Sequence, residues 1–195
     1  EYEQLKSLLT PSEYETAMGS VLNAHYTSRE VIGGIYAALE RFGVKGGNRI
    51  LEPAMGTGNF FGYMPQEIAT GARLYGVELD TVTGMIASKL YPQANVQIKG
   101  FEETSFPDDY FDLVVSNVPF GGYGVHDSEY SRQKFLIHDY FIAKSLDKVK
   151  PNGIVAVVTS KGTFDKLNPT ARKYMAERAE LLGAIRLPNT AFKQT

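Results

Sequence analysis

The chain has 195 residues, of which 43% are hydrophobic and 22% charged, and its formal net charge is −2. This composition indicates one globular domain, and no apolar run approaches the roughly 20 residues of a membrane span. The chain has no cysteine, which excludes disulfides and cysteine-bound metal, and its three histidines form no H-x-x-x-H pair, so we expect no metal site.

The predicted elements begin with an N-terminal helical extension at residues 1–24, in which Pro11 suits a first helical turn. A second helix begins after Thr27-Ser28 and ends before Gly43. From residue 49 onward, short apolar runs alternate with helical patterns. The predicted strands are 49–53, 73–78, 95–99, 111–116, 154–159 and 184–187, and the predicted helices between them are 60–67, 81–90, 135–149 and 169–182.

This alternation predicts an α/β fold, with a mainly parallel central sheet and helices on both of its faces. Such sheets bind ligands at the carboxyl ends of their strands, near the switch in strand order. The residues of this sequence that could take part in catalysis or ligand binding fall at those strand ends.

A glycine-containing loop, Leu51 to Phe60, follows the first strand. Gly56 and Gly58 allow a sharp turn and a close approach of the backbone to a ligand. Glu78 ends the next strand, where an acid usually accepts hydrogen bonds from ribose hydroxyls. Glu52 would repel a pyrophosphate but suits an ammonium group. The loop is therefore either a structural turn or a site for S-adenosylmethionine, which carries both an ammonium group and a ribose.

The tetrapeptide Asn117-Val118-Pro119-Phe120 follows the fourth strand, which lies next to the first in a sheet of this order. By itself it is most simply a turn with a packing aromatic. After a loop with an acid and two glycines, a chemical role is favoured. The Asn117 side-chain oxygen and the Val118 carbonyl can each accept one hydrogen of a planar amine, which localises the lone pair on nitrogen. Phe120 would stack on the base.

In order and spacing these motifs resemble those of class I S-adenosylmethionine-dependent methyltransferases, specifically the N6-adenine DNA methyltransferases with the gamma motif order. That family has N-P-P-F/Y where this chain has Val118 in the second position. The resemblance covers about residues 23 to 192 and implies a Rossmann-like fold. It implies catalytic roles for Asn117, Val118, Pro119 and Phe120. It implies cofactor contacts by Tyr26, Thr27, Glu52, Pro53, Ala54, Gly56, Gly58, Glu78, Leu79, Phe101, Glu102 and Asn117.

One part of the cofactor site departs from that family. After the third strand the family often has an acid before phenylalanine, where this chain has Gly100 before Phe101. We expect Phe101 to flank the adenine ring of the cofactor and Glu102 to bind its amine.

A closer resemblance is to methylase domains in very large proteins of bacterial mobile elements and phages, and it rests on residues 117–121, 137–141 and 159–163. It implies that residues 25–195 are a methyltransferase domain of a larger cytoplasmic, bacterial or phage-encoded protein. The expected partners are DNA and covalently linked helicase or recognition regions. The last strand of the fold and a target-recognition domain are expected to lie outside this chain.

Several alternatives share these residues. The catalytic turn does not separate DNA adenine from cytosine N4, RNA adenine or a protein glutamine, and the closer resemblance favours DNA adenine. A non-catalytic S-adenosylmethionine-binding module is a further alternative, and Glu52 disfavours a nicotinamide dehydrogenase. We interpret His138-Asp139 as structural. We interpret the scattered basic residues as a solvated face, namely Arg132, Lys134, Lys161, Lys166, Arg172 and Lys173.

Overall fold

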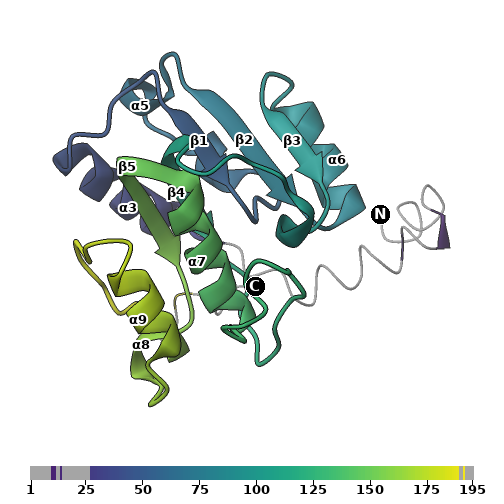
Figure 1. Ribbon diagram of the computed structural model, residues 1–195. Helices are drawn as coiled ribbons and strands as arrows, with labels where there is room; N and C mark the ends of the chain where they lie inside the picture. The colour runs from purple at the N-terminus through teal and green to yellow at the C-terminus, as the bar shows by residue number, and fades with distance from the viewer. Residues whose placement is uncertain (1–9, 12–13, 15–26, 189–190, 192–195) are drawn as a thin grey trace.

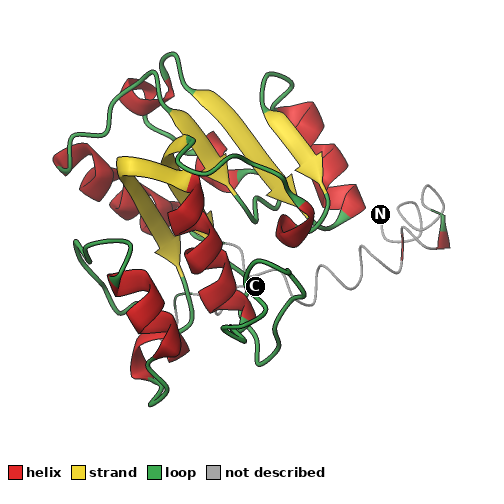
Figure 2. Ribbon diagram, in the orientation of Figure 1, coloured by secondary structure: helices red, strands yellow, loops and turns green. Residues whose placement is uncertain are grey.

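A computed structural model of the chain describes residues 10–11, 14, 27–188 and 191. Five strands form one sheet in the order β3-β2-β1-β4-β5, and its strands are parallel, as the sequence predicts, although six strands are expected from the sequence. The strands are β1 (Arg49–Glu52), β2 (Arg73–Glu78), β3 (Asn95–Ile98), β4 (Phe111–Asn117) and β5 (Val149–Val158). Figure 2 shows their arrows pointing the same way, so their carboxyl ends lie along one edge. β1 pairs with both β2 and β4, and the strand order reverses there.

Helices cover both faces of the sheet (Figure 1), which confirms the predicted layers. One face carries α3 (Arg29–Arg41), α4 (Asn59–Gly62), α5 (Gln66–Ala69) and α6 (Thr81–Leu90). The other carries α7 (Ile137–Lys148), with α8 (Gly162–Asp165) and α9 (Thr170–Ala176) beside it, and a short 3-10 helix, η1 (Phe101–Glu103), follows β3. Neighbouring residues of β1 serve opposite faces: Ile50 packs with α3, and Leu51 packs with α7.

Two helix starts are fixed by the caps expected from the sequence. Ser28 Oγ accepts a hydrogen bond from Val31 N at 3.4 Å, and Asp80 Oδ1 accepts one from Thr83 N at 2.7 Å. Each cap satisfies an amide that has no partner within the helix. The caps therefore fix the starts of α3 and α6, and α6 follows the carboxyl end of β2.

Several boundaries differ from those predicted. The helix expected at 60–67 is divided into α4 and α5, because Pro65 has no N–H to continue the helical hydrogen bonds. β5 begins at Val149 rather than 154, with an irregular register opposite Phe111 and Leu113. α7 begins at 137 rather than 135, and α9 ends at 176 rather than 182.

The predicted strand at 184–187 is wrong. These residues form no regular element, and Ile185 is 87% exposed. An alternating segment becomes a strand only where another strand pairs with it, and within the described part of the chain β5 pairs with β4 alone. The predicted N-terminal extension lies outside the described residues, apart from Thr10, Pro11 and Tyr14. No helix of the described residues is both long and apolar enough to cross a bilayer.

Candidate active site

The loop after β1 and the turn after β4 lie together where the strand order reverses. Ser116 Oγ donates to the Ala54 carbonyl at 3.4 Å, which joins the end of β4 to the glycine loop. On the other side, Val118 N–H donates to the Val158 carbonyl at 3.1 Å, which holds the turn against β5. Pro53 is buried beneath the loop. The bond between Ser116 and Ala54 therefore brings the predicted cofactor loop next to the predicted catalytic turn, and β5 holds the other side of that turn.

The glycine loop has the conformation that only glycine adopts easily. Gly56 and Gly58 have φ of 54° and 85°, in the left-handed region. Gly58 N–H donates to Met55 O at 2.7 Å, and Met55 N–H donates to Val77 O at 2.9 Å. The loop is thus a closed turn fixed to the end of β2.

We expect Gly58→Ala to lower the free energy of unfolding by more than Gly56→Ala. Both substitutions force a left-handed alanine, at a cost of about 1–2 kcal/mol. A Cβ on Gly58 would also overlap the Tyr91 ring, whose hydroxyl donates to Gly58 O at 2.8 Å, whereas a Cβ on Gly56 has no heavy atom within 4 Å. Urea titration of the two variants makes the comparison. Equal losses would contradict a close-approach role for Gly58.

Glu78 ties the end of β2 to the glycine loop. Its Oε2 accepts from Gly56 N at 2.8 Å, and its Oε1 accepts from Asp80 N at 2.8 Å. Burial raises the pKa of Glu78, and these amide hydrogen bonds oppose the rise. Each oxygen keeps a second acceptor position, so the carboxylate can also receive ribose hydroxyls. Leu79, which follows it, is 74% exposed at this edge.

Glu52 is buried below the loop, with 2% of its surface exposed. Burial raises its pKa well above the ordinary value, and hydrogen bonds from the backbone of Phe60 and Phe61 oppose that rise. Its Oε2 is buried and accepts no hydrogen bond from any residue the structure describes. A buried acceptor without a donor fits a cationic ligand group. The contact with an ammonium stays a prediction.

Phe101 and Glu102, which follow β3, differ in how deeply they are buried. The Phe101 ring is 2% exposed and packs against Phe141, with the ring centroids 5.1 Å apart. It therefore belongs to the core under α7 and is not open at the sheet edge, which does not support its predicted contact with the cofactor adenine. Glu102 is half-buried, and its carboxylate folds back over Gly100. Its predicted amine contact is untested.

The predicted N-terminal cofactor motif is only partly described. Thr27, directly before α3, is buried. Tyr26 lies outside the described residues. Their cofactor contacts stay predictions.

The turn after β4 is rigid despite the departure from the family tetrapeptide. Asn117 is the last residue of β4, and its Oδ1 is buried. The Val118 side chain is 1% exposed within the main core, while Pro119 and Phe120 are half-buried. Core packing of Val118, together with its backbone bond to β5, holds the conformation that a proline ring would otherwise restrict.

His138 and Asp139 are both buried in α7. Lys166 pairs with Asp139 Oδ2, so this lysine serves the interior and not a solvated face. His138 Nε2 lies 3.9 Å from Asp139 Oδ1, which is too long for a hydrogen bond. Burial lowers the pKa of His138, which favours its neutral form. Both ring nitrogens of His138 and Asp139 Oδ1 are buried without a hydrogen-bond partner among the described residues, so the structural interpretation of this pair stays a prediction.

Sequence reasoning missed a buried ion pair beside the site, between Lys144 of α7 and Asp127 of the preceding loop. Lys144 Nζ lies 3.1 Å from Asp127 Oδ2. No motif or periodicity marks either residue, because their proximity arises only when α7 packs on the sheet. The Tyr91 contact with Gly58 was missed because it also joins residues far apart in the chain, here when α6 packs beside the glycine loop.

Comparisons with known proteins show which family the chain belongs to. Residues 2–195 match the family model described as N-6 DNA Methylase. The chain is 33% identical, over 97% of its length, to the Defense against restriction protein B of Escherichia phage P1, of which it covers 8%. It is 28% identical to the Modification methylase CviBIII of Paramecium bursaria Chlorella virus NC1A, over 68% of this chain and 36% of that protein. The chain thus spans well under half the length of these two relatives.

Solved structures share the fold. A structure assigned to the class I S-adenosylmethionine-dependent methyltransferases, from Listeria monocytogenes, superposes with a TM-score of 0.72 at 21% identity, over 88% of this chain and 58% of that one. A Thermotoga maritima S-adenosylmethionine-dependent O-methyltransferase gives 0.54 at 15% identity, over 87% and 57%. The chain has the class I methyltransferase fold, and it belongs to the N-6 DNA Methylase family.

Proposed function

We propose that this domain transfers a methyl group from S-adenosylmethionine to the N6 amine of adenine in DNA. The observation that carries the proposal is the junction of the Asn117 turn with the glycine loop, through the bond from Ser116 Oγ to Ala54 O. It sets an amine-accepting turn beside a loop with a buried orphan acceptor, Glu52 Oε2. Glu52 would hold the ammonium group of the cofactor, and Glu78 its ribose.

The chain's own groups account for activation of the amine. S-adenosylmethionine supplies a methyl group on an electrophilic sulfonium. The lone pair of an adenine amine is delocalised into the ring, so the amine is a poor nucleophile. The Asn117 side-chain oxygen and the Val118 carbonyl each accept one amine hydrogen, which localises the lone pair for attack. Positioning and electrostatics then provide most of the rate, and the proton leaves afterwards to water.

The direct test is a labelled-methyl assay. The domain is incubated with unmethylated genomic DNA and S-adenosylmethionine carrying a labelled methyl group, and nucleosides are identified by mass spectrometry after digestion. Labelled N6-methyl-deoxyadenosine supports the proposal. Labelled N4-methyl-deoxycytidine would keep the mechanism but change the base. Label in neither, with S-adenosylhomocysteine still binding, would favour a non-catalytic module.

We also propose that regions linked to this domain in a larger polypeptide supply much of the affinity for DNA. That polypeptide acts in the cytoplasm, where its DNA substrate lies. Several cations of this domain are paired with its own carboxylates instead. Arg178 Nε lies 2.9 Å from Asp147 Oδ1, and Arg186 Nη2 lies 2.7 Å from Asp165 Oδ1. Because the net charge of the domain is −2, its binding to DNA would release few counterions from the phosphates.

We expect Phe120→Ala to raise the KM for DNA about 5- to 150-fold with little change in cofactor affinity, because base–aromatic stacking contributes about 1–3 kcal/mol. Phe120→Tyr keeps an aromatic face and should retain most of the activity. Steady-state kinetics with varied DNA measure the effect. Phe42→Ala, at the end of α3 before β1 and with 53% exposure, is the matched control and should leave the KM unchanged. A normal KM in Phe120→Ala would remove stacking from the model.

A further inference from the structure

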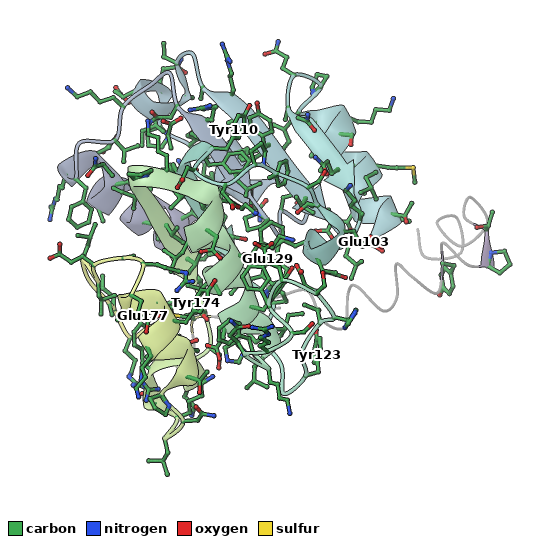
Figure 3. The ribbon with its side chains drawn as sticks, in the orientation of Figure 1. Glu103, Tyr110, Tyr123, Glu129, Tyr174 and Glu177 are labelled. Carbon is green, nitrogen blue, oxygen red and sulfur yellow. The ribbon has the colours of Figure 1, made fainter. Side chains whose placement is uncertain are left out.

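The segment that follows the catalytic turn, residues 121–136, is here named the substrate loop. Despite its glycines, it is anchored by buried side chains: Tyr130 is 4% exposed and Phe135 8% exposed, both in the main core. Ile137 N–H, at the start of α7, donates to Tyr123 O at 2.8 Å. Figure 3 labels Tyr123 and Glu129 on this loop, beside α7. The loop is thus attached to α7 along its length.

A buried lysine connects this loop to the cofactor side of the sheet. Lys144 is 2% exposed, and its Nζ donates to the Phe101 carbonyl of η1 at 2.8 Å and to Asp127 Oδ2 at 3.1 Å. Tyr140 OH donates to the same carboxylate oxygen at 2.7 Å. Burial tends to raise the pKa of Asp127, but the hydrogen bonds from Tyr140 and Lys144 lower it overall, so the carboxylate is charged.

This bridge joins two loops that the sheet keeps apart. η1 follows β3 and the substrate loop follows β4, and β2 and β1 lie between those strands. A buried ammonium is costly unless it is paired, so removing one partner leaves the other unsatisfied. Lys144 therefore fixes the position of the Phe101 carbonyl relative to the Asp127 carboxylate. A displacement of either loop would displace the other.

We propose that Lys144 is a positioning residue that couples occupation of the cofactor site to the order of the substrate loop. Ordering of η1 by the bound cofactor fixes the Phe101 carbonyl, and Lys144 passes that constraint to Asp127. The inference rests on the proposed function and on the predicted contact of Glu102, in η1, with the adenine amine of the cofactor, because it requires η1 to respond to the cofactor. Binding coupling is reciprocal, so a base held by the substrate loop would strengthen cofactor binding by the same factor.

Hydrogen exchange of the 195-residue chain, with and without S-adenosylhomocysteine, tests the coupling. In the wild type, the ligand should slow exchange at residues 52–60 and 98–104, and slow it in the substrate loop by at least about fivefold, the lower end of typical site-to-site coupling. In Lys144→Met, slowing at 52–60 should persist while slowing in the substrate loop is lost. Tyr140→Phe removes one hydroxyl and leaves the ion pair intact, so it keeps the test available if Lys144→Met does not fold, and its loop response should be reduced.

Tyr110→Phe is the matched control. It removes a tyrosine hydroxyl that forms a hydrogen bond with Tyr75 Oη at 2.8 Å, outside the substrate loop and η1, and should leave the coupling as in the wild type. Slowing at 52–60 of the wild type without slowing in the substrate loop would overturn the inference alone. Full loop slowing in Lys144→Met would also overturn it, as would full loop slowing in Tyr140→Phe where Lys144→Met does not fold. Absence of slowing at 52–60 in the wild type would overturn the proposed cofactor site, and the inference with it.

Discussion

Asn117→Ala is expected to lower kcat for methyl transfer by about 10²–10³-fold, the typical loss when one preorganised polar group at the reacting centre is removed. Asn117 ends β4 at the strand-order switch, and the Val118 turn after it is held by β5, so the alanine variant should leave the backbone in place. The side-chain acceptor for the amine is lost. Single-turnover kinetics with labelled S-adenosylmethionine measure the rate of the chemical step.

The matched control is Asn95→Ala. Asn95 is exposed at the first residue of β3, at the opposite end of the sheet from the catalytic turn, and its loss should leave kcat unchanged. Because Asn117 is also predicted to contact the cofactor, binding of S-adenosylhomocysteine is measured on both variants. An Asn117→Ala enzyme that binds cofactor and transfers methyl at the wild-type rate would end the amine-activation model.

Glu78→Ala should weaken binding of S-adenosylmethionine about 10- to 100-fold, because hydrogen bonds to a charged group contribute about 1.5–3 kcal/mol. The substitution also removes the acceptor of the Gly56 and Asp80 amides, so the glycine loop loses its tie to β2. Cofactor affinity is measured by calorimetry at a temperature where the variant is folded by circular dichroism.

Glu67→Ala, in the exposed first turn of α5, is the control for Glu78→Ala. It removes one carboxylate from the same domain without touching the carboxyl edge of the sheet, so affinity should match the wild type. An unchanged cofactor affinity in Glu78→Ala would show that this carboxylate does not hold the ribose.

The order of the elements and the positions of the site loops could be predicted from the amino-acid sequence. The alternation of strands and helices, the cap at Asp80 and the turn at Gly58 follow from local chemistry: side-chain periodicity, one side chain bonding an amide three residues on, and a backbone conformation that glycine adopts freely. Asn117 could be placed next to the glycine loop because parallel α/β sheets of this order bring those strand ends together.

The side chains that each loop presents, and the segments that pair, depend on packing between distant parts of the chain. Phe101 carries an aromatic ring that sequence reasoning gave to the cofactor, but α7 packs over it and takes it into the core. The segment 184–187 alternates like a strand, yet in the described structure nothing pairs with it. Lys144 reaches the Phe101 carbonyl across 43 positions of sequence. Each of these outcomes depends on contacts between residues far apart in the chain, and neither local periodicity nor turn chemistry carries information about such contacts.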